Sequence, residues 1–164
     1  MMEHGAPAIF VALEQSGFAA AIRQSRWLYP FANVGHILSL TAFASAVAVM
    51  DLRLLGAFAA TAPGRLLAHA RRAAVAAFCG LAATGFMLFS AEASHLVANP
   101  VLRLKFLLVA AGLLNVLAYE IVARRAVEAL PPSAPLPRAA GVAAALSLVI
   151  WVAVAACGRS IAYF

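Results

Sequence analysis

Residues 33–56 read NVGHILSLTAFASAVAVMDLRLLG, and this stretch decides the fold class. It is an apolar run as long as a helix that crosses a bilayer, which needs about 20 residues. His36 lies one turn inside one end of the run, and Asp51 lies near the other. An ionisable side chain is costly in lipid, so it is usually paired, bound to a metal or functional. The stretch therefore predicts a membrane-spanning helix and makes His36 a candidate functional residue.

The composition of the whole chain also indicates an integral membrane protein. Of its 164 residues, 65% are hydrophobic and 11% are charged, whereas soluble domains have about 45–50% and about 25%. The formal net charge is +6, but the arginines lie at the ends of apolar segments, which suits anchoring in a lipid bilayer. A soluble basic surface with base-reading groups is missing from the pattern, so we expect no nucleic-acid partner.

Three further segments are long and apolar enough to span a bilayer. The four expected spans cover about residues 29–55, 73–98, 101–123 and 139–163. Short or proline-marked connections separate them, and short connections make successive helices antiparallel neighbours. We therefore expect an all-α, integral membrane, up-and-down four-helix bundle over residues 29–164.

Residues 7–25 show a different pattern, in which apolar residues recur at near-helical spacing between polar ones and Gly17 interrupts. This pattern predicts an amphipathic helix that lies in the membrane interface. Trp27 and Tyr29 follow it, and such amphipathic rings prefer the headgroup boundary. Residues 1–28 are thus expected to form a tail and an interfacial helix.

Lysine and arginine counts predict the orientation of the bundle. The side that holds both termini has five: Arg23, Arg26, Arg103, Lys105 and Arg159. The other side has seven: Arg53, Arg65, Arg71, Arg72, Arg124, Arg125 and Arg138. The positive-inside rule places the larger group in the cytoplasm. We therefore expect a bacterial inner-membrane protein with both termini in the periplasm.

Two histidines fall at similar depths near the periplasmic side. His36 lies six residues after Pro30, roughly 9 Å along the helix, and His95 lies four residues before Asn99. Two imidazoles on neighbouring helices can hold the iron of haem b as axial ligands. Three basic residues near this side are placed to pair with haem propionates: Arg103, Lys105 and Arg159.

Two alternatives for these histidines stay open. Together with Glu92, His36 and His95 form a ligand set that suits copper or another divalent ion. The other alternative is structural, because His36 can hydrogen-bond across helices to Asn33, Glu92 or a carbonyl. An interfacial His95 then needs no special role.

A second polar cluster is expected at the cytoplasmic side, where Asp51, Asn115 and Glu120 lie near arginines such as Arg53 and Arg71. Ion pairing that closes this end of the bundle is the simpler interpretation. The alternative is a proton path or a contact with quinone, roles that carboxylates inside membranes also serve.

These residues form a pattern that resembles a bacterial family of four-span membrane proteins catalogued as a domain of unknown function. The pattern covers residues 25–164 and implies the four-span fold. It comprises SRWLYP at 25–30, Asn33, HIL at 36–38, DLRLLG at 51–56, TG at 84–85, NP at 99–100, Lys105, Asn115 and GRSIAY at 158–163.

A more distant resemblance runs to the CopD-type copper-resistance membrane proteins. They also carry a histidine in the first span, a Thr-Gly pair, a lysine and an asparagine, in the order in which His36, Thr84, Gly85, Lys105 and Asn115 occur here. This resemblance implies copper handling. The chain has four methionines and no methionine-rich segment.

The first functional hypothesis is an inner-membrane b-type haem protein that passes electrons between quinone and a periplasmic partner. The second is a copper- or metal-handling membrane protein. The third is a non-catalytic small subunit that packs against a larger membrane complex through its alanine-rich faces. The alanine-rich fourth span predicts close helix contacts, within one chain or between chains of an oligomer.

Overall fold

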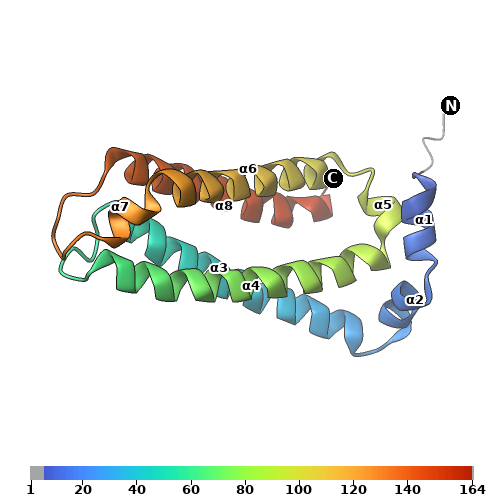
Figure 1. Cartoon of the computed structure of the whole chain (residues 1–164). Coiled ribbons are helices and arrows are strands. Elements are labelled where there is room, and N and C mark those ends of the chain that lie inside the picture. The colour runs from blue at the N-terminus through green and yellow to red at the C-terminus, as the bar shows by residue number, and fades with distance from the viewer. Residues whose placement is uncertain (1–5, 164) are drawn as a thin grey trace.

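The computed structural model describes residues 6–163, apart from the side chain of Ala162. The first five residues of the expected tail lie outside this range. Four helices are long and apolar enough to cross a membrane: α3 (Leu28–Leu54), α4 (Pro63–Ala91), α6 (Pro100–Val122) and α8 (Arg138–Ser160). They run alternately up and down along one common direction (Figure 1). The predicted all-α membrane bundle is confirmed, and the chain is a multi-pass membrane protein.

The second span differs in its limits from the predicted residues 73–98. Helix α4 begins ten residues earlier, at Pro63, because a proline without an N–H group is well suited to the first helical position. It ends at Ala91, where the backbone of Glu92 leaves the helical region. A one-turn helix, α5 (Ala93–Leu96), follows. Arg71, which we expected before the span, therefore lies on α4.

The four long helices form two antiparallel pairs. Helix α3 packs along α4, α6 packs along α8, and contacts between α3 and α8 join the pairs. Helices α4 and α6 have little direct contact with each other. A short helix, α7 (Arg124–Glu128), contacts α4, and a 3-10 turn, η1 (Ile161–Tyr163), ends the described chain. The bundle is therefore two helical hairpins joined along one side.

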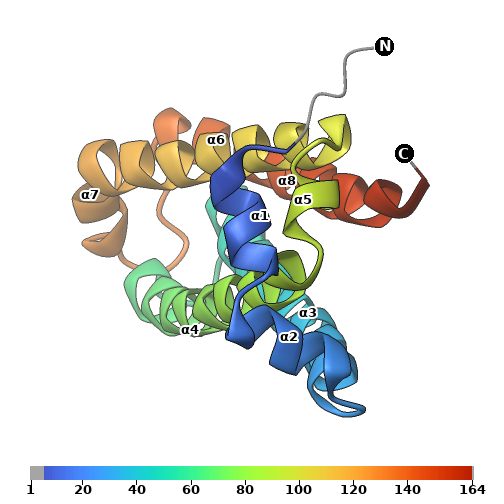
Figure 2. The ribbon, with the colours of Figure 1, turned by 90° about the vertical axis from the view of Figure 1, so that its right-hand side faces the viewer.

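The N-terminal amphipathic segment forms two helices where the sequence predicts one. These are α1 (Ala8–Glu14) and α2 (Gly17–Gln24), and they lie across the end of the bundle, against α4 and α5 (Figure 2). The break occurs because Ser16 caps α2, its Oγ accepting a hydrogen bond from the N–H of Ala19. Nη1 of Arg23 donates to the carbonyl of Ala91 at 3.0 Å, which ties α2 to the last turn of α4.

Two apolar clusters fill the bundle. One lies near α7 and consists of Leu54, Leu67, Tyr119, Ala123, Val127, Ala140 and Ala144. The other lies midway along the helices, around Phe43. There the Phe43 ring meets Trp151 edge to face with centroids 4.6 Å apart, a favourable aromatic geometry. We call the end of the bundle with α1, α2 and α5 the α5 end, and the opposite end the α7 end.

Candidate functional site

His36 lies inside the first hairpin, where α3 packs on α4. Its Nδ1 is 2.9 Å from Oγ1 of Thr84. The same Oγ1 lies 2.6 Å from the carbonyl oxygen of Gly80, one turn earlier on α4, and donates its hydrogen there. A hydroxyl group has a single hydrogen to donate. Thr84 therefore accepts from His36, so Nδ1 carries the imidazole proton and Nε2 keeps a free lone pair.

Small residues let α3 and α4 approach closely around this histidine. A Cβ atom at Gly85 would lie 3.2 Å from Cε1 of His36, and one at Gly35 would lie 3.2 Å from the methyl group of Thr84. A Cβ at Gly80 would lie 2.6 Å from Oγ of Ser39, closer than packed atoms allow. The imidazole is thus held by the backbone of α4 as well as by Thr84.

Lys105 lies across from this hairpin, on α6. Its Nζ would be 3.6 Å from a Cβ atom at Gly158, so the side chain packs on α8. The side chain is partly buried. Lys105 makes no hydrogen bond or ion pair with any other residue among 6–163. Lys105 therefore lies, partly buried, on the hairpin opposite to the one that holds His36.

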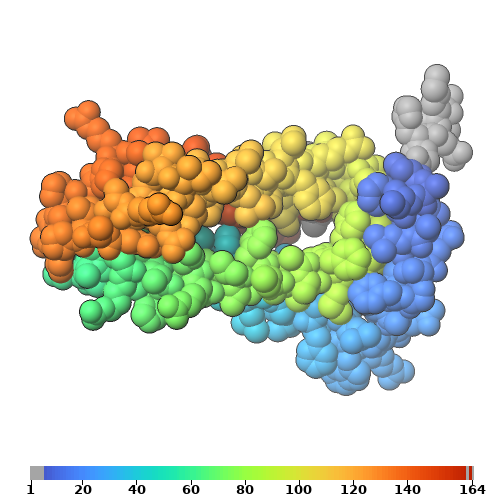
Figure 3. Space-filling model, viewed as in Figure 1, coloured from blue at the N-terminus to red at the C-terminus, as the bar shows by residue number. Residues whose placement is uncertain are grey.

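Figure 3 shows an opening between the surfaces of α4 and α6 in the half of the molecule nearer α5. It follows from the pairing of the helices, since α4 and α6 scarcely touch. A flat ligand between the two hairpins would meet α4 on one side and α6 on the other.

The remaining predicted ligands lie farther toward the α5 end. His95 is on α5 and is exposed, as is Glu92. Because α4 continues six residues past Gly85, roughly 9 Å, before α5 begins, His95 and His36 lie at different levels. In the part of the chain that the structure describes, no three His, Cys, Asp or Glu side chains gather as a metal site.

The two other arginines predicted near a cofactor have local partners. Nε of Arg103 donates to the carbonyl of Val97 at 3.1 Å. Nη2 of Arg159 donates to the hydroxyl of Tyr163 at 2.5 Å, and the guanidinium lies 4.8 Å from the centre of that ring. Both arginines are exposed, so Lys105 is the predicted basic residue that faces the inside of the bundle.

Of the polar cluster predicted at the other end, Glu120 and Arg71 belong to a four-membered ion-pair network, whereas Arg53 donates to the carbonyl of Thr61. Arg71 on α4 lies 3.0 Å from Glu120 on α6 and 3.0 Å from Glu128 on α7, and Arg124 contacts the same two carboxylates. Burial would raise the pKa of Glu128, but the hydrogen bonds from Arg71 and Arg124 outweigh it and hold the pKa below its usual value. Ion pairing thus joins the two hairpins at the α7 end.

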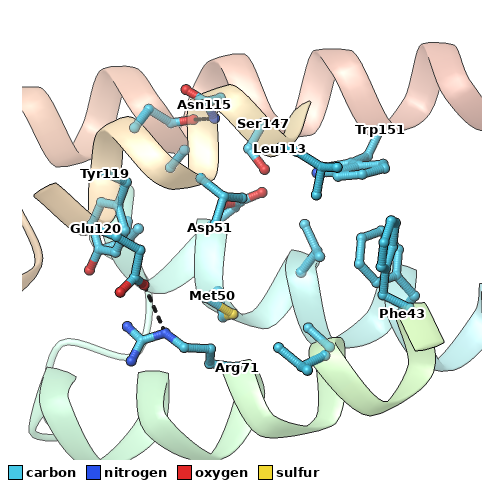
Figure 4. A pocket seen from close by; sticks show the side chains of 18 of the residues that line it. Phe43, Met50, Asp51, Arg71, Leu113, Asn115, Tyr119, Glu120, Ser147 and Trp151 are labelled. Carbon is cyan, nitrogen blue, oxygen red and sulfur yellow. Dashed lines mark hydrogen bonds and ion pairs between the residues drawn. The ribbon is translucent and has the colours of Figure 1, made fainter. Parts of the chain in front are cut away.

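Asp51 is not part of this network. Its residue is 6% exposed, and its carboxylate is directed toward the hydroxyl of Ser147 on α8 (Figure 4). It lines a cavity of about 190 Å³ between the hairpins, which also borders Asn115 and Glu120. The sequence drew attention to Asp51 but not to Ser147, Tyr119 or Trp151, which line the same cavity.

Comparison with known proteins was made with this geometry in hand. Residues 17–164 match the model of a family of unknown function, DUF6644. The chain belongs to this family. No curated protein and no solved structure matches it. The family model covers all four long helices and α2, so the predicted membership in a four-span family of unknown function is confirmed, whereas the similarity to CopD-type proteins is not shown.

The family has no known function, so the activity has to be argued from the site.

The sequence held only partial signals for the cavity residues that were not predicted, which are Ser147, Trp151 and Tyr119. Ser147 and Trp151 are four residues apart on α8 and so share a helix face. Tyr119 immediately precedes Glu120. None of them is a polar residue of unusual type in a membrane helix, and only the pairing of the hairpins places them around Asp51.

Proposed function

We propose that this member of the family is a membrane haem protein, in which Nε2 of His36 would hold the iron of one b-type haem between the two hairpins. The observation that supports the proposal is the hydrogen-bond chain from His36 through Thr84 to Gly80. Histidines that bind metals usually donate their second ring N–H to a fixed acceptor, which sets the tautomer and the ring orientation.

The residues around His36 fit such a group. Gly85 lets the imidazole pack directly on α4, and the space between α4 and α6 is open in the half of the molecule nearer α5 (Figure 3). Lys105 supplies a cation on the opposite hairpin that has no partner among the described residues. A carboxylate such as a haem propionate would neutralise this charge, which otherwise is costly in a membrane. Lys105 would thus bind the propionate while His36 binds the iron.

Haem held by histidine accepts and releases single electrons, so the activity that we propose is electron transfer between a membrane quinone and a periplasmic partner. The unequal arginine distribution supports an inner-membrane location with both termini in the periplasm. In that orientation His36 and Lys105 lie in the periplasmic half of the bundle, nearer the electron acceptor. His95 and Glu92 are exposed at the α5 end, and the proposal gives them no ligand role.

The visible absorption spectrum of the protein, purified in detergent after expression with added haem precursor, tests this function. We expect a Soret band and reduced α-band in the wild type and in His95→Ala, the matched control. His36→Ala is expected to lose both bands while keeping its helical circular dichroism. Retention of full haem content by His36→Ala would contradict the proposal.

The same preparations separate the other hypotheses. A colourless wild-type protein with stoichiometric copper by elemental analysis, lost in His36→Ala, would favour metal handling. A colourless protein without metal would favour a non-catalytic subunit of a membrane complex.

A further inference from the structure

The cavity beside Asp51 lies in the half of the bundle nearer α7, away from His36. Its walls are mainly apolar, and at one side the rings of Phe43, Phe78 and Trp151 line it. Its mouth is flanked by Val75 on α4 and Leu113 on α6, both of which are exposed on the outer surface of the bundle. The cavity therefore opens sideways, toward the lipid.

Four polar atoms of residues that line this cavity are buried without a hydrogen-bond partner: Oδ2 of Asp51, the hydroxyl of Tyr119, and Nε and Nη2 of Arg71. Nε of Arg71 lies 3.0 Å from Glu120 in an ion pair, which leaves the other three to be explained. Buried polar groups in folded proteins are nearly always hydrogen-bonded, so each such atom calls for an explanation. An ionised carboxylate can only accept a hydrogen bond, a guanidinium can only donate one, and a phenol can do both.

The neighbouring polar groups are already engaged elsewhere. Nδ2 of Asn115 donates to the carbonyl of Ala143 at 2.9 Å, and Arg71 uses Nε and Nη1 for Glu120 and Glu128. Figure 4 shows Asp51 and Ser147 facing each other on the side of the cavity where Asn115 and Arg71 lie. Trp151 and Phe43 lie on the opposite side. One side of the cavity is thus polar and incompletely bonded, and the other is aromatic.

We infer that this cavity binds the ring of a membrane quinone or quinol. A quinol hydroxyl can donate to Asp51, and a ring oxygen can accept from Tyr119 or Arg71. The aromatic side chains supply flat apolar walls, and an isoprenoid tail would leave through the mouth between α4 and α6. The cavity of about 190 Å³ is smaller than sites that enclose a whole drug-sized ligand, about 300–1,000 Å³, which fits a bound ring with its tail in lipid.

Two other occupants fit the same observations less well. A lipid acyl chain would fill the apolar part but leave all three polar atoms unpaired. A lipophilic cation would pair with Asp51 but would also meet the positive charge of Arg71, which lines the same cavity. A neutral quinol ring, whose hydroxyl groups can both donate and accept, satisfies both a carboxylate and its cationic neighbour. This inference rests on the proposed function for its choice of quinone, but it does not require haem.

Tryptophan fluorescence gives a direct test, because the chain has two tryptophans and Trp151 alone lines the cavity. Trp27→Phe leaves Trp151 as the reporter, and Trp151→Phe leaves Trp27 as the matched control. Each protein in nanodiscs is titrated with a decyl-substituted benzoquinone, which quenches indole fluorescence on contact, and with decylbenzene, which has the tail but no oxygen. We expect saturable quenching by the quinone in Trp27→Phe only.

Variants of the polar side then identify the contacts. In the Trp27→Phe protein, Tyr119→Phe is expected to weaken quinone binding about tenfold, and Asp51→Leu to weaken binding of the reduced quinol, measured by its competition with quinone, about tenfold; each is the cost of losing one hydrogen bond to a buried partner. Asp51→Asn, which keeps a polar side chain, should lose less affinity than Asp51→Leu. Tyr29→Phe, away from the cavity, should bind with unchanged affinity. Circular dichroism confirms that each variant is folded.

Absence of saturable quenching in Trp27→Phe would overturn the inference. Quinone affinity in Tyr119→Phe and quinol affinity in Asp51→Leu that are unchanged from the Trp27→Phe parent, or competition by decylbenzene at the same concentration as quinone, would overturn it in favour of an acyl-chain site. Repeating the titration in the His36→Ala background separates this site from the haem. Quinone binding without haem in any preparation would reject the proposed function and keep this site, and haem without quinone binding would do the reverse.

Discussion

Nδ1 of His36 lies 2.9 Å from Oγ1 of Thr84, and this contact joins the first long helix to the second. Because Thr84 spends its hydrogen on the carbonyl of Gly80, the threonine acts on the imidazole as an acceptor. The contact therefore determines which ring nitrogen can bind a ligand. The hydroxyl of Thr84 is engaged by both Gly80 and His36. Thr84 would therefore act through His36, as a residue that positions the imidazole.

Replacing Thr84 by valine keeps the shape of the side chain and removes the acceptor. We expect Thr84→Val to lower haem affinity about 10- to 100-fold, as loss of such an outer hydrogen bond does at other metal sites. The haem-to-protein ratio after dialysis against a haem-binding competitor measures this. Thr84→Ser keeps the hydroxyl and should retain wild-type haem content, so equal losses in the two variants would point to packing and contradict a positioning role.

The close approach of α3 and α4 predicts that side-chain size at Gly80 and at Ser39 is coupled. A Cβ atom at Gly80 would lie 2.6 Å from Oγ of Ser39, so Gly80→Ala should destabilise the protein by about 1–3 kcal/mol, as overpacking does in other cores. Ser39→Gly removes the opposing atoms, and the double variant should recover most of the lost stability. Thermal unfolding in detergent measures both. Additive losses in the double variant would show that the two positions do not meet.

The fold was largely predictable because lipid imposes a strong constraint: a spanning segment must be long, apolar and helical. This constraint located all four spans from hydropathy alone. It did not locate the start of α4, because residues 63–72 carry Arg65, Arg71 and Arg72 and look like a connection. The helix extends through them since Arg71 pairs with carboxylates on α6 and α7. These partners are distant in sequence and become neighbours only in the folded chain.

The candidate site was predictable only in part for a similar reason. Residue type and depth identified His36 and Lys105, and the structure places both, partly buried, on opposite hairpins. Depth counting also paired His36 with His95, but it assumed one straight helix up to Asn99. The bend at Glu92 and the one-turn helix α5 place His95 on the exposed end instead. Local backbone breaks of this kind carry no hydropathy signal.

The ion-pair network at the α7 end predicts unequal roles for its two arginines. Arg71 joins α4 to carboxylates on α6 and α7, whereas Arg124 makes pairs four residues apart along its own stretch of chain. All four groups are partly exposed, so screening limits each pair. We expect Arg71→Met to lower the free energy of unfolding by about 1 kcal/mol and Arg124→Met by about 0.3–0.5 kcal/mol. A larger effect at Arg124, measured by thermal unfolding, would contradict this order.

Glu14 predicts a pH dependence for the attachment of α1 to the bundle. Its carboxylate accepts hydrogen bonds from the hydroxyl and from the N–H of Ser94 on α5. The Ser94 hydroxyl and then its N–H hold the pKa of Glu14 below the usual value of 4.5. Because the folded-state pKa is the lower one, the stabilisation is complete above about pH 4.5 and is lost as the pH falls through the folded-state pKa.

Glu14→Gln should therefore melt at a lower temperature than the wild type at pH 7, and this difference should shrink toward zero as the pH is lowered below 4.5. The amide ¹⁵N–¹H signal of Ser94 should titrate in the wild type with a midpoint under 4.5 and should not titrate in Glu14→Gln. Gln15→Glu, on the exposed neighbour, tests for a general charge effect and should leave the Ser94 titration in place. A Ser94 midpoint above 4.5 would mean that burial outweighs the hydrogen bonds, so that the α1–α5 contact strengthens on acidification instead.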